Sequence, residues 1–369
     1  MNGRCTALAA FLLLVPCAAW ADVGTPLVWA TGFHMVFGNA LLGVFEGWFL
    51  AKIFDLQRSR CIGLMILANY LSAWLGMFIV GALRTSQAVD IYNALRVSLT
   101  LVFVTYVLTF LLEWPFVVLC FRRSPQWFAR SVRGSLLVQT ISYLLLFGGF
   151  WLVSGKTLYT DMKIVPASEL FLPDAVQVFF IAEADGDVYR MSNRGTPTRI
   201  CNLNSTNVWD FLRFQKSKQE PTFWDMVAVR DRHRGEDKAI TILSNVYLPE
   251  AVRFTQQYWG WGSASRVGAA TNSPWHFQWS HWNDLGMWGT NEKTGERLRV
   301  AFGTPIIGWP VWRAIQLPGE NVLFQLGSGQ LCLLDIERRR IALLARGHGP
   351  VAVMDTELSN QTVVATQLH

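Results

Sequence analysis

Charged side chains are scarce in this sequence: Asp, Glu, Lys and Arg make up 16% of its 369 residues, whereas hydrophobic residues make up 51%. Soluble globular domains typically carry about 25% charged residues. The composition therefore excludes an ordinary soluble protein and predicts a chain with a membrane part and a soluble part.

Local catalytic and cofactor motifs are missing as well. The sequence has no HExxH, GxSxG, P-loop, GxGxxG, CxxC or CxxCH motif. His276 and His281 resemble a metal pair, but their odd separation would put them on opposite faces of a strand. We therefore expect no metal and no cofactor, and a non-enzymatic role is favoured. Dispersed catalytic residues would leave no local motif, so the possibility of a tethered enzyme stays open.

Cysteine is also sparse, with six residues in the chain. Two lie in the first 21 residues, and Cys61 and Cys120 lie at the ends of apolar segments. Only Cys201 and Cys332 belong to the remaining half, where they predict either one disulfide or two buried free thiols.

The net charge of +6 is unevenly distributed. The first 155 residues carry 10 basic and 5 acidic side chains, and the remainder carries 22 and 21. The basic excess thus lies in the apolar half, which removes the main electrostatic argument for a nucleic-acid partner.

Residues 1–21 have the pattern of a cleaved signal peptide. Arg4 precedes a short apolar run that stops at Pro16, and Ala19 and Ala21 form a small-x-small cleavage site. The run is too short for a membrane-spanning helix. We expect the mature protein to begin at Asp22.

Four apolar segments, 26–54, 61–83, 95–121 and 135–153, are each long enough to span a bilayer and predict a four-helix transmembrane domain over 22–155. The two loops with several basic residues are predicted to be cytoplasmic. This places the mature N-terminus and the C-terminal half on the periplasmic side of a bacterial inner membrane. The basic residues in and beside these loops are Lys52, Arg58, Arg60, Arg122, Arg123, Arg130 and Arg133.

The first and second pairs of segments resemble each other. Glu46 and Glu113 each precede a phenylalanine by eight positions, at the same end of their segments. In the partner segments, an amide and a hydroxyl lie three residues apart and share a helix face: Asn69 with Ser72, and Gln139 with Ser142. The pattern favours a parallel duplication of a helical hairpin.

Helical geometry places Asn39 within about 20° of Glu46 around the helix axis. Small residues at four-residue spacing predict close helix packing and a compact bundle. These small residues are Gly43 and Gly47 in the first segment, and Ala68, Ser72 and Gly76 in the second.

Carboxylates inside a membrane segment are costly and usually face a bundle interior or a wet cavity. One interpretation is that Glu46 and Glu113 form a proton or cation site together with the polar neighbours Asn39, Asn69, Ser72, Gln139 and Ser142. The other is that hydrogen bonds from these neighbours to the glutamates only fix helix register.

Residues 156–174 contain Pro166 and Pro173 and are predicted to be a linker. The region 175–369 has hairpin patterns at spacings of about 40 to 50 residues, which predict an exterior β-propeller-like domain or a β-sandwich. One helix is expected at 207–216.

Eight of the 17 tryptophans lie between residues 259 and 312. Trp275, Trp279, Trp282 and Trp288 predict either an aromatic ligand surface or buried core residues. The leading expectation is a non-enzymatic anchor, scaffold or sensor in the lipid bilayer, whose exterior domain binds a ligand or another membrane or exterior protein. The alternative is a proton- or cation-coupled transport component that uses Glu46 and Glu113.

Overall fold

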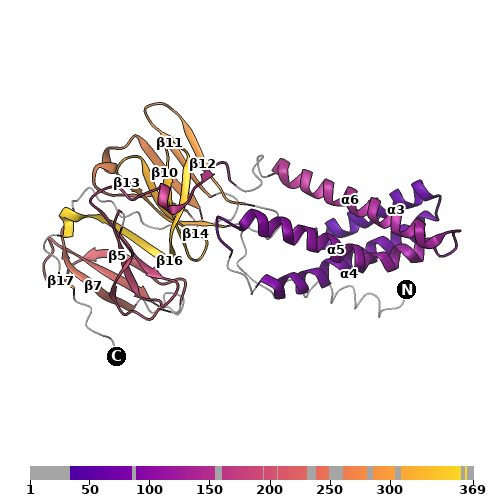
Figure 1. Cartoon of the computed structure of the whole chain (residues 1–369), viewed down its shortest axis with the longest axis horizontal. Coiled ribbons are helices and arrows are strands. Elements are labelled where there is room, and N and C mark those ends of the chain that lie inside the picture. Colours follow the sequence, from indigo (N-terminus) through magenta and orange to yellow (C-terminus); the bar gives the residue numbers. More distant parts are fainter. Residues whose placement is uncertain are drawn as a thin grey trace. The chain divides into compact units, whose positions relative to one another are not determined.

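The computed structural model describes residues 34–84, 89–153, 160–193, 195–205, 207–230, 238–248, 261–280, 286–303, 309–358 and 362–363. The chain divides into a helical unit and a β unit, each compact in itself (Figure 1). The predicted signal peptide, 1–21, lies outside the described residues.

Within the described residues, the helical unit contains four long helices, as predicted. They are α3 (Asn39–Phe54), which continues the short π-helix η2 (His34–Gly38), α4 (Arg58–Arg84), α5 (Ala94–Phe121) and α6 (Trp127–Val153). Among the described residues, two stretches, Met35–Phe54 and Ala94–Phe121, are long and apolar enough to cross a membrane.

Two glycines bring α3 and α4 into backbone contact. A Cβ atom added to Gly43 would lie 2.5 Å from the Ile66 Cα, and one added to Gly47 would lie 2.5 Å from the Ile62 Cα. Ala68 is fully buried. Gly76 differs, because no atom lies within 4 Å of its added Cβ. It lines a cavity rather than a tight helix contact.

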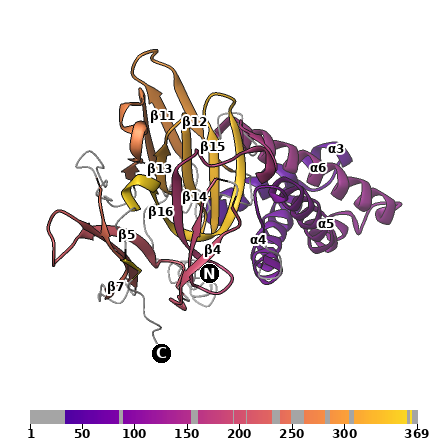
Figure 2. The same cartoon turned by 60° about the vertical axis from the view of Figure 1, so that its left-hand side comes forward.

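The β unit is built on one curled nine-stranded sheet (Figure 2). Its strand order is β4-β3-β2-β16-β15-β14-β13-β9, and β1 pairs with β16. These strands are β1 (Lys163–Ile164), β2 (Val176–Ala182), β3 (Val188–Met191), β4 (Thr198–Cys201), β9 (Ser265–Arg266), β13 (Val311–Leu317), β14 (Asn321–Leu326), β15 (Gln330–Asp335) and β16 (Arg340–Met354).

Two four-stranded sheets complete the unit, in the orders β12-β11-β10-β8 and β17-β7-β6-β5. Their strands are β5 (Phe211–Lys216), β6 (Trp224–Arg230), β7 (Lys238–Val246), β8 (Trp261–Ser263), β10 (Trp275–Ser280), β11 (Met287–Asn291), β12 (Arg297–Val300) and β17 (Thr362–Val363).

This arrangement is β-rich, as predicted, but it differs from a ring of separate blades and from a plain two-sheet sandwich. The 15-residue strand β16 pairs with β15 along its first part and with β2 along its last part. It thereby joins strands from both ends of the region in one sheet. The helix predicted at 207–216 is wrong: β5 begins at Phe211 and pairs with β6 over its full length.

Of the residues predicted to be a linker, the described part, 160–174, belongs to the β unit. β1 pairs in parallel with β16, with Lys163 opposite Arg340, and Leu170 and Leu172 are buried. The unit also contains Asp90–Tyr92, from the connection between α4 and α5.

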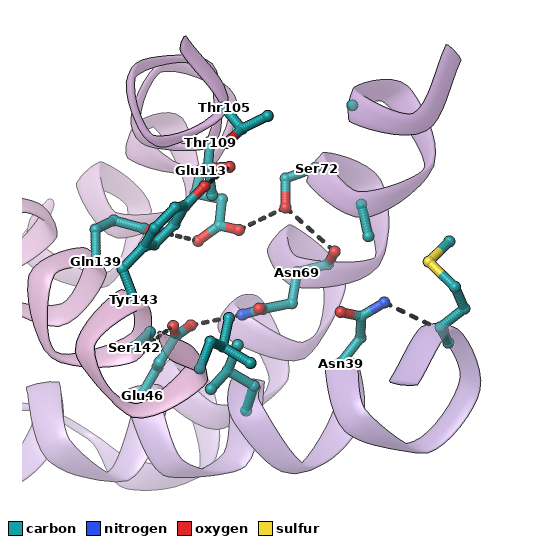
Figure 3. Close-up of a pocket in the computed structure, with 15 residues that line it drawn as sticks. Asn39, Glu46, Asn69, Ser72, Thr105, Thr109, Glu113, Gln139, Ser142 and Tyr143 are labelled. Carbon is teal, nitrogen blue, oxygen red and sulfur yellow. Dashed lines mark hydrogen bonds between the residues drawn. The ribbon is translucent and has the colours of Figure 1, made fainter. Parts of the chain in front are cut away.

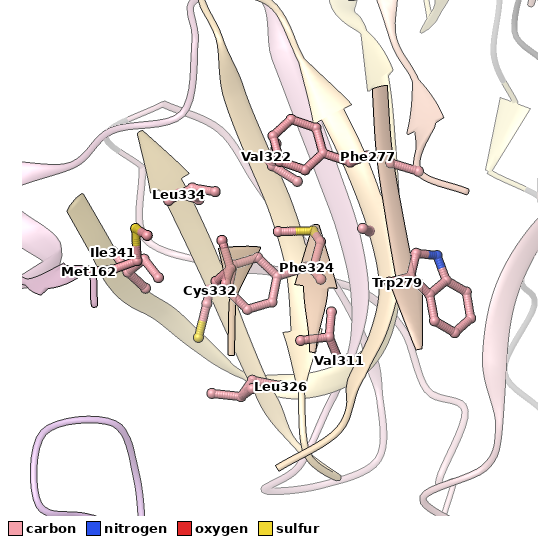
Figure 4. Close-up of a cluster of buried hydrophobic side chains, with 14 of the residues drawn as sticks. Met162, Phe277, Trp279, Val311, Val322, Phe324, Leu326, Cys332, Leu334 and Ile341 are labelled. Atoms are coloured by element: carbon pink, nitrogen blue, oxygen red, sulfur yellow. The ribbon is translucent and has the colours of Figure 1, made fainter. Parts of the chain in front are cut away.

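Cys332 and Trp279 lie in a large hydrophobic cluster of the β unit (Figure 4). Cys201 lies in a separate cluster, and both cysteines are free thiols rather than a disulfide. Burial raises the pKa of Cys201 to about 11 and raises that of Cys332 as well, so both stay protonated.

The tryptophans do not form one exposed surface. Trp275 and Trp279 are 3% and 4% exposed and belong to the core. Trp288 is partly exposed and donates from Nε1 to Gln278 Oε1 at 3.0 Å. Trp282 lies outside the described residues.

Candidate functional site

Glu46 of α3 and Glu113 of α5 are buried inside the helical unit, each 1% exposed. Asn69 Nδ2 donates to Glu46 Oε2 at 2.5 Å, and Ser142 Oγ donates to Glu46 Oε1 (Figure 3). Both oxygens of this carboxylate therefore have a donor, which lowers the cost of burying it.

Glu113 has the same kind of environment. Ser72 Oγ donates to its Oε1 at 2.5 Å, and Gln139 Nε2 donates to its Oε2. Each glutamate thus receives one amide from its own hairpin and one hydroxyl from the other hairpin. The two hydroxyl bonds tie the α3–α4 hairpin to the α5–α6 hairpin, and the two amide bonds join the helices within each hairpin.

The equivalent residues have regular spacings. Asn69 and Gln139 are 70 residues apart, as are Ser72 and Ser142, and the two glutamates are 67 apart. The near-equal spacings match the pairwise resemblance of the two hairpins in the sequence.

The two halves are also connected to each other. Besides Glu113, Ser72 Oγ lies 3.2 Å from the carbonyl oxygen of Asn69, whose side chain donates to Glu46. Figure 3 shows the resulting continuous chain. It links six residues, in the order Gln139, Glu113, Ser72, Asn69, Glu46 and Ser142, and at Asn69 it passes from the backbone carbonyl to the side-chain amide.

A cavity of about 300 Å³ adjoins this chain. Asn39 lines it but bonds to neither glutamate, because its Nδ2 donates to the Met35 carbonyl at 3.1 Å. The full lining is Met35, Asn39, Leu42, Glu46, Asn69, Ser72, Ala73, Gly76, Thr105, Thr109, Glu113, Gln139, Ser142, Tyr143 and Leu146.

Three polar lining residues were missed by sequence reasoning: Thr105, Thr109 and Tyr143. The two threonines precede Glu113 at four-residue intervals and so share its helix face. That spacing was a readable signal. Tyr143 had a weaker signal, since it only follows Ser142 in the sequence.

On the other side of the glutamates, toward Phe54 and Phe121, the bundle is apolar. These two rings meet edge to face with centroids 5.0 Å apart, and the Arg130 guanidinium lies over both. Leu50 and Met65 are fully buried in the same cluster. The cavity therefore lies toward Met35 and Gly76 and not toward the Phe54 end.

Arginines bind the helix ends at this apolar end. Arg60 Nη2 donates to the Leu119 carbonyl at 2.7 Å, and Arg130 Nη2 donates to the Phe54 carbonyl at 2.8 Å. Each contact joins one hairpin to the C-terminal turn of a helix in the other hairpin, where carbonyl groups lack helical donors.

Within the described residues, neither glutamate has a basic side chain in ion-pair distance, and no cluster of three or more His, Cys, Asp or Glu could hold a metal ion. Two adjacent buried carboxylates without a cationic partner are unfavourable when both are ionised. The arrangement favours binding of a proton or another cation.

No protein-family model, curated protein or solved structure matches this chain. The functional argument therefore depends on the geometry of the site.

Proposed function

We propose that this is a multi-pass membrane protein whose helical unit binds protons or a small cation at Glu46 and Glu113. The observation that carries the proposal is the buried carboxylate pair, in which each oxygen accepts a hydrogen bond and neither group has a basic partner among the described residues. Such intramembrane carboxylates are typical of proton and ion pathways.

The outer faces of the helices support a membrane location. Each helix exposes large apolar side chains, such as Leu41, Phe78, Phe103 and Leu144, which are 71%, 66%, 67% and 67% exposed. Asn39, Glu46, Asn69, Ser72, Glu113, Gln139 and Ser142 face inward, which is the arrangement a lipid environment favours.

The basic residues at the α3–α4 and α5–α6 connections support an orientation with these loops in the cytoplasm of a bacterial cell. The β unit would then be periplasmic. Alkaline phosphatase fused after residue 57 should be inactive, and fused after residue 88 it should be active. The reverse result would contradict the orientation.

Infrared difference spectroscopy during a pH titration tests the binding of protons. The purified full-length chain in lipid nanodiscs should show titrating carbonyl bands of protonated carboxylic acids. Glu46→Gln and Glu113→Gln should each remove one band or shift it. Glu220→Gln, at an exposed position of the β unit, is the control. Bands identical in all variants would overturn the proposal.

The one-sided position of the cavity favours a site that loads from the periplasmic side. Transport would require the Phe54–Phe121 contact to open. Proton flux measured in reconstituted vesicles distinguishes a transporter from a sensor. Flux that Glu46→Gln abolishes, and that an uncoupler makes equal in the variant and the unmodified chain, supports transport. Protonation of the carboxylates without proton flux supports a sensor.

A partner-binding role of the β unit is a second proposal. It is supported by the neighbouring exposed residues Val208 and Trp209, each 49% exposed, of which Trp209 packs edge to face on Trp312 at 5.4 Å. Exposed aromatic side chains are enriched at protein interfaces. Crosslinking from position 208 in intact cells should capture a membrane or exterior protein, and only self-crosslinks or none would contradict this role.

A further inference from the structure

We propose that the cavity beside Glu46 and Glu113 is a binding site for a small primary ammonium ion, which it takes up in exchange for a proton. The inference rests on the proposed function of the carboxylate pair and names the ligand class of that site. Three features carry it: the hydrogen-bonding character of the lining, its charge, and its size and shape.

The lining offers acceptors because much of its donor capacity is used within the protein. Asn39 Nδ2 donates to the Met35 carbonyl, and Thr105 Oγ1 donates to the Val102 carbonyl at 2.9 Å. The hydroxyls of Thr109 and Tyr143 bond to each other at 3.3 Å. Four further donors are directed at the two carboxylates.

Oxygen lone pairs of the two carboxylates and two amides outnumber the donors left over, which are the second N–H of Asn39 and of Gln139 and one hydroxyl hydrogen of the Thr109–Tyr143 pair. Each carboxylate oxygen accepts one hydrogen bond and keeps further acceptor capacity, and the Asn39 and Asn69 amides keep their carbonyl oxygens. A ligand with several N–H donors and a positive charge complements such a site. A primary ammonium group carries three donors and one charge.

The size and walls of the cavity favour an organic cation over a bare metal ion. At about 30 Å³ for each water, 300 Å³ holds on the order of ten waters. Met35, Leu42, Ala73 and Leu146 add an apolar wall. A short alkyl chain would displace water from this wall, which stabilises the complex. An alkali ion would leave the apolar wall unused.

Charge balance links the ammonium ion to a proton. In the empty site, protonation of one of the two carboxylates leaves a single negative charge on the pair. Arrival of the ammonium ion favours loss of that proton to solvent, after which two carboxylates face one cation. Binding should therefore release a proton and tighten as the pH rises, for as long as the amine stays protonated.

Isothermal titration calorimetry with n-butylammonium chloride tests the proposal on the full-length chain in nanodiscs. If binding releases a proton, the measured binding enthalpy should differ between buffers of different ionisation enthalpy, because the buffer takes up that proton. n-Butanol, which lacks the charge, and tetramethylammonium, which lacks N–H donors, should bind at least tenfold more weakly. Equal binding of n-butanol, or displacement of n-butylammonium by an equal concentration of KCl, would overturn the ammonium assignment.

A pair of glycine variants on α4 supplies a matched control. Gly76→Leu fills the cavity from a position where an added Cβ meets no atom within 4 Å, so the fold should tolerate it. Gly63→Leu has the same freedom at an exposed position away from the cavity. Gly76→Leu should abolish n-butylammonium binding, and Gly63→Leu should leave it unchanged.

The infrared titration separates the two proposals. If carboxylic acid bands titrate normally but n-butylammonium does not bind, the pair is a proton site and the ammonium inference fails alone. If neither occurs, both fail. Equal binding by Gly76→Leu and the unmodified chain would place the ligand elsewhere and would also overturn the inference.

Discussion

At the scale of single residues, the site depends on the difference between its amides and its hydroxyls. Asn69 and Gln139 direct NH₂ groups, which can only donate, at the carboxylates. Ser72 and Ser142 direct hydroxyls, which can either donate or accept. A proton arriving on Glu46 or Glu113 is therefore best accommodated on Oε1, the oxygen that faces a serine.

Ser142→Ala should destabilise the helical unit, because Glu46 Oε1 would be buried without its donor. Loss of a hydrogen bond to a charged group costs about 1.5–3 kcal/mol. Ser135→Ala, on the same helix, is the matched control: Ser135 is 1% exposed and its Oγ has no partner among the described residues. Unfolding by SDS in mixed micelles measures both. Equal losses of stability in the two variants would contradict the importance of the Ser142 bond.

His348 makes the stability of the β unit depend on pH. Burial lowers the pKa of this side chain, and the charge of Arg313 lowers it further, while Asp210 and the Asn207 carbonyl oppose the shift. Because the fold favours the neutral imidazole, its stabilising effect is complete above the ordinary value of about 6.5. It is lost as the pH falls through the lower pKa of the folded state.

His348→Gln should therefore flatten the pH dependence of the melting temperature between neutral and mildly acidic pH. The comparison with the unmodified chain removes the effects of other groups, such as Glu357, whose pKa burial raises. Thermal unfolding followed by near-ultraviolet circular dichroism at several pH values gives the two profiles. Parallel profiles would show that His348 does not contribute.

At the scale of helices and strands, the contact between α3 and α4 depends on glycine. An alanine at Gly43 would place its Cβ 2.5 Å from the Ile66 Cα, so the helices would have to separate. Overpacking of this kind costs about 1–3 kcal/mol.

Gly43→Ala should lower the stability of the helical unit by that amount. Gly63→Ala, on α4, meets open space and should be neutral, or stabilising by up to about 1 kcal/mol through its helix propensity. SDS unfolding in mixed micelles compares the two. A neutral Gly43→Ala would mean that α3 and α4 are less tightly packed than the structure describes.

The helices and the polar face of the bundle could be predicted from the sequence because a 3.6-residue period and long apolar runs are local signals. The spacing of Asn69 with Ser72 and of Gln139 with Ser142 pointed to residues that the structure brings to the two glutamates. Which donor would meet which glutamate was not predictable, because it depends on how the two hairpins pack.

The β unit was harder to predict because strand pairing is not local. The segment 207–216 has apolar residues at helical spacing, yet its strand β5 is stabilised by pairing with β6 and by burial of Phe211, Leu212 and Phe214. Hairpin patterns identified many strands but gave no information on which hairpins share a sheet.

At the scale of the whole molecule, the helical unit and the β unit are organised differently. In the helical unit, each of the two hairpins supplies a serine hydroxyl to the glutamate of the other. The β unit is continuous in space but not in sequence, since it includes Asp90–Tyr92 together with residues from 160 onward. A cut at the end of α6 would therefore remove part of the β unit.

Those three residues are well integrated into the β unit. Ile91 is 1% exposed in its largest hydrophobic cluster, and the Ile91 N–H donates to Gln330 Oε1 at 2.9 Å. Asp90 accepts an ion-pair hydrogen bond from Arg346 at 2.8 Å. The Leu343 N–H donates to the Tyr92 hydroxyl at 3.3 Å.

Ile91→Ala in the full-length chain should therefore destabilise the β unit, although the residue lies between two helices in the sequence. Truncation of a buried isoleucine costs about 2–5 kcal/mol. Hydrogen exchange should accelerate in β15 and β16, which carry Gln330 and Arg346, more than in α4 or α5. Leu95→Ala, at an exposed position of α5, is the control and should change neither. Unchanged exchange in β15 and β16 would mean that Asp90–Tyr92 only passes over the β unit, and the fold of that unit would then depend on residues from 160 onward alone.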